Sequence, residues 1–123
     1  EISSPDLNID AIIDIDDVNN DNYKIIEKLA PFGMANPKPL FLFKEVPINT
    51  VKEFGKEKNH LELTFKNSRG RDVKAIAFFK TRESYGNILE VGNKINMVAS
   101  IEKNNFLGKE EIRLRIVDIL NKM

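Results

Sequence analysis

The segment at residues 29–39, Leu-Ala-Pro-Phe-Gly-Met-Ala-Asn-Pro-Lys-Pro, restricts the possible folds of this chain more than any other. Its three prolines and one glycine exclude both an α-helix and a central β-strand, because proline lacks a backbone N–H group and fixes φ. Phe32 and Met34 add apolar side chains that a solvated linker does not need. The segment is therefore predicted to be an ordered loop that ends one structural unit and begins another.

The residues before this loop predict one strand and one helix. Apolar and polar residues alternate over residues 7–15, as in a strand with one buried face. A near-helical spacing of apolar residues follows, with Asp16 or Asp17 as the predicted N-cap and Pro31 as the end of the helix. A lone strand and helix cannot bury themselves. Residues 1–39 are therefore predicted to be a connecting segment that docks on the following domain or on other parts of a longer protein.

The residues after the loop, 40–123, have a β pattern. Their order is three strands, a short helix and two strands, which predicts a mainly β fold, the five-stranded OB-fold Greek-key barrel, with other small barrels as alternatives. The predicted strands cover residues 46–54, 60–66, 72–79, 95–101 and 112–119, and Thr81 is predicted to cap a helix that runs to about Leu89. The side chains expected to point inward are Leu61, Leu63, Phe65, Ile95, Met97, Ala99, Ile101, Ile112, Leu114, Ile116 and Ile119.

Composition excludes several classes of protein. The sequence has no cysteine, so disulfides, thiolate nucleophiles and cysteine-based metal sites are excluded. No apolar run approaches the ~18 residues of a membrane span. The N-terminus lacks a signal-peptide pattern, which predicts a cytoplasmic protein, and its lack of an initiator Met suggests a fragment of a longer chain.

No catalytic or metal-binding set of residues is recognisable. Asp14, Asp16 and Asp17 lie close in sequence, but no histidine joins them, and they are interpreted as a solvated strand edge and a helix cap. The single histidine, His60, could stack on a base, bind a phosphate or simply end a strand. The chain by itself is therefore expected to be non-catalytic and to hold no cofactor.

Charge points to nucleic-acid binding. Residues 1–39 carry eight acidic and three basic side chains, a net −5, whereas the rest carry sixteen basic and eleven acidic, a net +5. Single strands are held by a basic groove with aromatic side chains that stack on bases. Phe41, Phe43, Phe54, Phe65 and Phe78 are assigned to packing, and the lysines could be ordinary solubilising charges. The predicted binding residues are Lys52, Lys56, Lys58, His60, Lys66, Arg71, Lys74 and Phe106, the last at a hairpin tip over residues 104–108.

The loop at 29–39 resembles the L-A-P-F-G-x-G-N-P-x-P segment that precedes the OB-fold domain of RecJ-type single-stranded-DNA-specific exonucleases. Ala35 stands where that family has its second glycine, which costs about 1 kcal/mol if the position needs positive φ. Residues 58–63, 75–78, 104–108 and 114–119 are similar, in order, to later landmarks of the family.

The resemblance implies an OB domain that grips single-stranded DNA beside the nuclease core of the same parent chain. It implies a 5′–3′ exonuclease of DNA repair and recombination, with Mn²⁺ or Mg²⁺ held by a D-H-H motif that this sequence lacks. A single-strand-binding protein is a further possible partner. Two alternatives stay open, a barrel that only docks on proteins and an RNA-binding OB module of another enzyme.

Overall fold

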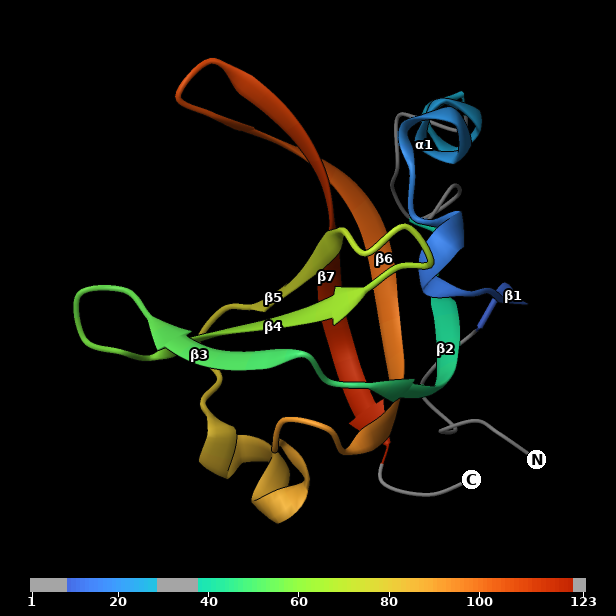
Figure 1. Cartoon of the computed structure of the whole chain (residues 1–123). Helices are drawn as coiled ribbons and strands as arrows, with labels where there is room; N and C mark the ends of the chain where they lie inside the picture. Colours follow the sequence, from blue (N-terminus) through green and yellow to red (C-terminus); the bar gives the residue numbers. More distant parts are fainter. Residues whose placement is uncertain (1–8, 29–37, 121–123) are drawn as a thin grey trace.

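One curled β-sheet makes up most of the chain (Figure 1). The structure is a computed structural model that describes residues 9–28 and 38–120. Residues 29–37 of the predicted loop at 29–39, including Pro31, lie outside the described residues, as do residues 7 and 8 of the first predicted strand. The strands are β1 (Ala11–Ile12), β2 (Phe41–Pro47), β3 (Thr50–Phe54), β4 (His60–Lys66), β5 (Asp72–Ala77), β6 (Lys94–Phe106) and β7 (Lys109–Leu120).

The sheet has the order β1-β2-β6-β7-β5-β4-β3. The pairs β1–β2 and β5–β7 are parallel, and all the others are antiparallel. A mainly β fold is therefore confirmed. The predicted count of five strands is not, because the described residues form seven strands and no ladder joins the two ends of the sheet.

Much of this difference comes from residues 46–54, where the prediction of one strand was wrong. Pro47 ends β2 and Thr50 begins β3. Between them the Ile48 N–H donates to the Asn93 carbonyl at 2.9 Å, and the Asn49 N–H donates to the Thr64 carbonyl at 2.8 Å. The chain thus passes from β2, which pairs with β6, to β3, which pairs with β4. The sheet therefore curls, and its two ends approach each other at Ile48 and Asn49.

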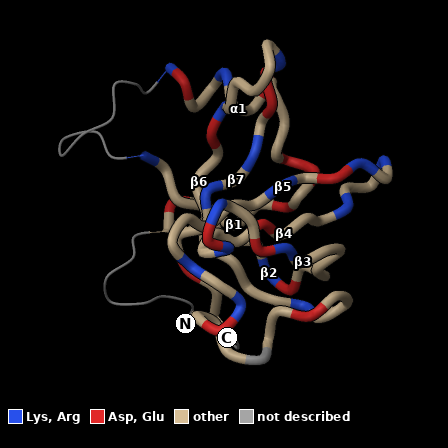
Figure 2. Tube along the Cα trace, turned by 90° about the vertical axis from the view of Figure 1, so that its left-hand side faces the viewer, with Lys and Arg blue, Asp and Glu red and all other residues tan. Residues whose placement is uncertain are grey.

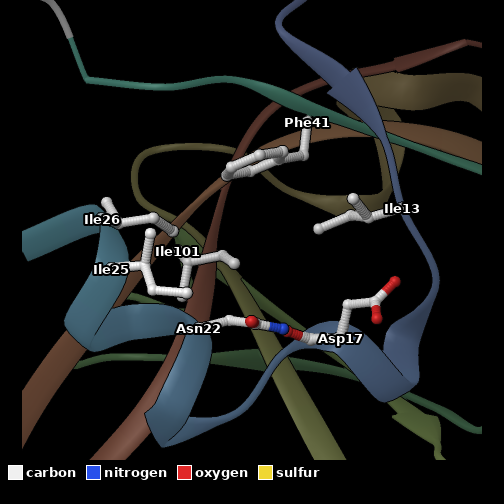
Figure 3. Close-up of a pocket in the computed structure, with 7 residues that line it drawn as sticks. All are labelled: Ile13, Asp17, Asn22, Ile25, Ile26, Phe41 and Ile101. Carbon is white, nitrogen blue, oxygen red and sulfur yellow. The ribbon is translucent and has the colours of Figure 1, made fainter.

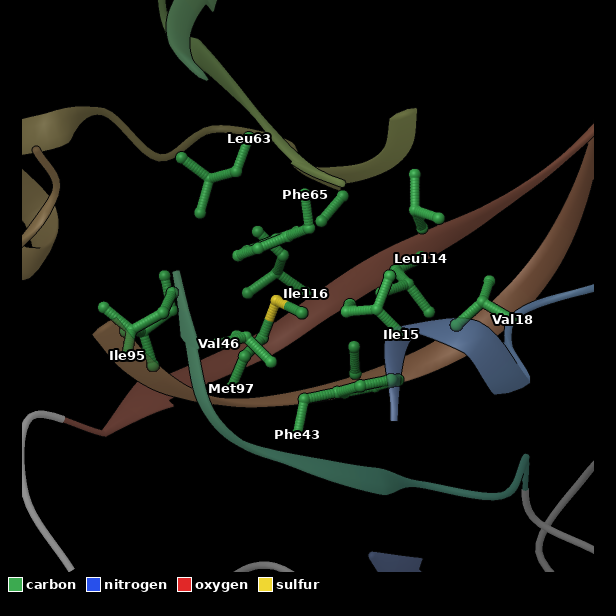
Figure 4. Close-up of a cluster of buried hydrophobic side chains, with 14 of the residues drawn as sticks. Ile15, Val18, Phe43, Val46, Leu63, Phe65, Ile95, Met97, Leu114 and Ile116 are labelled. Carbon is green, nitrogen blue, oxygen red and sulfur yellow. The ribbon is translucent and has the colours of Figure 1, made fainter. Parts of the chain in front are cut away.

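The core lies inside this curl (Figure 4). The inward positions predicted on β4 and β6 are confirmed, since each of these side chains belongs to the buried core cluster. On β7, Leu114, Ile116 and Ile119 are buried and Ile112 is half-buried. The change of spacing after Ile116 matches a β-bulge, because Ile116 pairs with Ala99 and Asp118 pairs with Val98.

The N-terminal segment packs on the sheet, but its elements differ from the prediction. The strand predicted over residues 7–15 is limited to β1, and Ile15–Asp17 form a 3₁₀ turn. The helix α1 spans Asn20–Glu27, and Asn19 caps it by accepting the Asn22 N–H at 2.8 Å. Asp17 instead accepts the Asp14 N–H at 2.9 Å, because the chain turns at these aspartates before the helix starts. The buried side chains that dock the segment on the core are Ile15, Val18 and Ile26.

The connection between β5 and β6 is helical, as predicted, and Thr81 is its N-cap. It is a 3₁₀ helix over Arg82–Ile88 rather than an α-helix, and Gly86 with φ of 74° interrupts it. Tyr85 on this helix is half-buried, and burial, aided by the Asp118 carboxylate, raises the pKa of its hydroxyl. In the part of the chain that the structure describes, neither this helix nor α1 is long and apolar enough to cross a membrane.

One carboxylate ties the N-terminal segment to the β4–β5 turn. Asp16 Oδ1 accepts the Ser68 N–H at 2.7 Å. This bond lowers the pKa of the Asp16 carboxyl below its ordinary value of 3.8. A carboxyl whose pKa is depressed by folding stabilises the folded state above the unfolded pKa, and the effect is lost as the pH falls through the folded pKa.

We therefore expect Asp16→Asn to lower stability at neutral pH, and the difference from the native chain to shrink as the pH falls below about 3.8. Urea unfolding of both proteins at about pH 7 and about pH 3 checks this. A difference that stays constant between the two pH values would contradict it.

Candidate nucleic-acid interface

A groove runs over the outward face of the sheet beside the β6–β7 hairpin. We call it the outer groove; its volume is about 340 Å³, within the ~300–1,000 Å³ typical of ligand sites. Its floor is made by β3, β4 and β5, and the β6–β7 hairpin forms its wall. The floor residues are Phe54, Glu62, Lys74 and Ile76, and the wall residues are Asn104, Phe106, Lys109, Glu111 and Arg113.

Strand alternation explains why these side chains face outward. Leu61, Leu63 and Phe65 of β4 fill the core, so Glu62 between them points to the opposite face. The register then places Lys52 of β3 and Ile76 of β5 on either side of Glu62. The outer groove thus lies on the outward face of the strands whose other face builds the core.

Four rings gather at one end of this face, and we call them the aromatic cluster: Phe54, His60, Phe78 and Phe79. The His60 ring centroid lies 5.3 Å from that of Phe54, 5.2 Å from that of Phe78 and 4.9 Å from that of Phe79. Phe78 is 37% exposed and Phe79 is 76% exposed. An exposed group of rings of this kind offers π-faces on which nucleic-acid bases can stack.

The aromatic cluster corrects the sequence prediction for Phe78. Phe78 does not face the core, because Val73, Ala75 and Ala77 occupy the inward positions of β5. Phe54 is half-buried and packs on His60 and Phe78 at the surface, which agrees with its assignment to packing. The assignment of Phe41, Phe43 and Phe65 to packing is confirmed, since all three belong to the core or pack against it.

Two arginines of β7 cover the cluster. The Arg115 guanidinium lies 4.5 Å from the Phe78 ring centroid, and that of Arg113 lies 6.0 Å from it. Glu102 Oε2 accepts from Arg113 Nε at 2.7 Å and from Arg115 Nη2 at 3.2 Å. The Glu102 side chain is only 14% exposed, so this ion pair holds both guanidinium groups in place beside the rings.

The structure places six of the eight predicted binding residues at or near the outer groove and the aromatic cluster, and the other two at the far end of β4. Lys74 and Phe106 line the outer groove, Lys52 pairs with Glu62 of its floor, and His60 belongs to the aromatic cluster. Lys56 and Lys58 are exposed in the β3–β4 turn, which adjoins His60. Lys66 and Arg71 lie at the opposite end of β4, next to the turn at residues 67–70.

Ion pairs reduce the positive charge of this surface. Lys66 Nζ lies 2.9 Å from Asp72 Oδ1, and Lys74 Nζ lies 3.4 Å from Glu111 Oε2. Figure 2 shows that basic and acidic residues are interspersed along the chain. The predicted binding residues therefore lie on a surface of mixed charge, with separate basic positions.

The tip of the β6–β7 hairpin is shorter than predicted. Asn104 and Asn105 belong to β6, and the turn itself consists of Leu107 and Gly108, with φ of 51° and 78°. Positive φ at both positions is the requirement of a tight two-residue hairpin turn. Phe106 just before the turn is 66% exposed, as predicted, and it lines the outer groove.

Sequence reasoning missed Lys109, Arg113, Arg115 and Phe79. A signal existed for the two arginines, because they alternate with the inward residues Ile112, Leu114 and Ile116 of β7. No such signal existed for Phe79, whose exposure depends on the turn that follows β5.

A second hollow, which we call the side groove, lies between α1 and the sheet (Figure 3). Its volume is about 330 Å³. It is lined mainly by apolar side chains, and Ile25 among them is 62% exposed. Such a surface is suited to protein contact rather than to a polyanion. The lining residues are Ile13, Asp17, Asn22, Ile25, Ile26, Phe41 and Ile101.

Comparisons with known proteins agree with one another. The family model described as the RecJ OB domain matches residues 9–118. The single-stranded-DNA-specific exonuclease RecJ of Bacillus subtilis (strain 168) is 25% identical over 114 residues, which cover 93% of this chain and 14% of that protein. The chain thus spans about a seventh of the length of this curated relative.

Solved structures give the same fold. Crystal structures of RecJ from Thermus thermophilus in complex with Mg²⁺ and with Mn²⁺ match with TM-scores of 0.60 and 0.61. The sequence identities are 21% and 22%, and each match covers 82% of this chain and 14% of the other.

Proposed function

The chain belongs to the RecJ OB domain family, and on this basis we propose that its outer groove holds single-stranded DNA for a RecJ-type exonuclease. In this proposal the parent enzyme digests DNA in the 5′–3′ direction, in repair and recombination, in the cytoplasm. The observation that carries the proposal is the meeting of exposed rings and basic side chains on one outward face, described above for the aromatic cluster and the outer groove.

The bases of the strand would stack on the rings. The aromatic cluster lies at one end of the face, and Phe106 lines the wall of the outer groove. Stacking of a base on an aromatic side chain contributes about 1–3 kcal/mol and accepts any base, because every base has a π-face. Binding of this kind does not depend on the base sequence of the strand, as an exonuclease requires.

The phosphates would meet the basic side chains along the same face. Lys56 and Lys58 adjoin the aromatic cluster, Lys52 lies beside the floor, and Lys109 lines the wall. Contacts to phosphate fix the position of a nucleic acid without reading its sequence. The proposed role is therefore to grip the strand, while the nuclease core of the parent chain cleaves it.

Catalysis and its metal ions are assigned to that core. The relatives of known structure were crystallised with Mg²⁺ or Mn²⁺. Among residues 9–28 and 38–120, no three histidine, aspartate or glutamate side chains converge as a metal site would need. The described residues therefore do not fit the metal centre of such an enzyme.

A salt titration tests the proposal. If about four phosphates are contacted, the logarithm of the association constant for an oligo-dT strand should fall against the logarithm of salt concentration with a slope near −3. Fluorescence anisotropy at three salt concentrations measures it. No binding at low salt would overturn the proposal, and tighter binding of an RNA of matched sequence would favour the alternative of an RNA-binding module.

The side groove supports a second candidate function, docking on the nuclease core of the parent chain. Ile25 and Ile12 are 62% and 57% exposed and belong to the N-terminal segment, which packs on the sheet. Large apolar side chains in such positions are typical of an interface with another protein unit. The two functions use different faces and are compatible.

A further inference from the structure

Phe79 has a backbone conformation that its side chain does not favour. Its φ is +59°, in the left-handed region, although its residue type is neither glycine nor asparagine. Glu45, Lys58 and Leu107 also have positive φ. Lys58 and Leu107 lie in hairpin turns that require it, and Glu45 lies at the register shift of β2, where its N–H donates to Asn96 Oδ1. Phe79 lies in the turn after β5 and still presents its ring to solvent. A contact with another residue is therefore needed to hold Phe79 in this strained backbone conformation with its ring exposed.

The imidazole of His60 makes this contact. The Phe79 N–H donates to His60 Nδ1 at 3.0 Å. The two ring centroids are 4.9 Å apart with the planes at 79°, an edge-to-face arrangement. Because Nδ1 accepts this bond, the proton of the neutral ring is on Nε2. One side chain therefore fixes both the backbone and the ring of Phe79.

His60 is itself fixed from three sides. The rings of Phe54 and Phe78 lie 5.3 Å and 5.2 Å from its ring. On the third side is Gly55, where a Cβ atom would come within 2.7 Å of the imidazole Cδ2. Gly55 also has φ of +97°, so a residue with a side chain there would be strained as well as crowded.

We propose that His60 is a positioning residue, whose Nδ1 holds Phe79 in place as the exposed face on which an unpaired base stacks. The inference rests on the proposed function, because it names which ring of the aromatic cluster takes the base. It also changes the role of His60, which would act through Phe79 rather than by binding a phosphate.

Binding of the full chain to oligo-dT by fluorescence anisotropy, with two single variants, tests this first. Phe79→Ala should weaken binding about 5- to 150-fold at every salt concentration without changing the salt slope, since stacking releases no counterions. His60→Ala should cause most of that loss. The double variant should bind no more weakly than Phe79→Ala alone, since both changes remove the same contact. The matched control is Ile25→Ala, which removes an exposed apolar side chain outside the outer groove and should bind as the native chain does.

A second pair of variants separates the hydrogen bond from the ring. In His60→Asn the side-chain oxygen can accept in place of Nδ1, so binding should recover in part relative to His60→Ala. In His60→Phe the ring contacts remain but the acceptor is lost, so binding should stay weak. Amide hydrogen exchange reports the bond itself: the Phe79 N–H should be protected in the native chain and exchange faster in His60→Phe.

The outcomes distinguish this inference from the proposed function. If the native chain fails to bind oligo-dT, both fail together. If it binds while Phe79→Ala binds equally well, Phe79 is not the stacking surface and only the inference is overturned. If Phe79→Ala binds weakly while His60→Phe binds like the native chain, the positioning role of His60 is wrong. Unfolding midpoints of all variants identify any that fail to fold.

Discussion

Replacing Leu63 with alanine is expected to lower the free energy of unfolding by about 2–5 kcal/mol. Leu63 is fully buried on β4, between the neighbours Val51 of β3 and Ala75 of β5. The substitution removes buried apolar surface and leaves a cavity that the surrounding strands can fill only in part. Urea denaturation measures the loss as a lower midpoint at an unchanged m-value.

The control for this prediction is Glu62→Ala, one residue away on the opposite face of the same strand. Glu62 lines the outer groove, and its carboxylate is not part of the core. Its removal should change stability by less than about 1 kcal/mol. Equal losses for the two variants would mean that the register of β4, and with it the position of the outer groove, is wrong.

The second large effect is expected on DNA binding. Replacing Lys74 and Lys109 together with alanine should weaken binding to oligo-dT about 50-fold at ~50 mM salt and about 10-fold at ~200 mM, from roughly 0.7 ions released at each contact. Both lysines line the outer groove. Removing Lys74 also leaves Glu111 without its ion-pair partner, which adds repulsion toward phosphate.

Two exposed lysines provide the control, one on α1 and the other at its C-cap. Lys24→Ala with Lys28→Ala changes the net charge by the same amount, but both residues lie outside the outer groove. This variant should retain nearly native affinity and the native salt slope. Equal weakening by the two pairs would mean that only the overall charge of the chain attracts DNA.

Several features of the fold could be predicted from the sequence because they depend on local periodicity. The inward face of β4 follows from strict alternation of apolar and polar residues over 60–66, and that of β6 from an alternation over 95–101 that only Val98 breaks. The split of residues 46–54 into β2 and β3 could not be read in this way. It depends on where the N–H groups of Ile48 and Asn49 find acceptors, and both acceptors lie far away in the sequence.

The candidate site was predicted less well, because it depends on pairings between strands. Lys52 next to a turn, Lys74 on its strand and Phe106 at a hairpin tip could each be predicted near it from the local sequence. Lys66 and Arg71 are close to Lys74 in sequence but belong to the other end of the β4–β5 hairpin. The aromatic cluster was missed because Phe54, His60 and Phe79 come from three elements that only the antiparallel register brings together.

Mapping the bound strand on the surface is the decisive test of the proposed DNA-binding face. In an NMR titration of the chain with oligo-dT, the backbone amide signals of Phe54, Ile76 and Phe79 should shift with added DNA. The signals of Ile13 and Ile25 in the side groove should stay unchanged. Shifts confined to the side groove, or no shifts at low salt, would contradict the claim that the outer groove and the aromatic cluster hold single-stranded DNA.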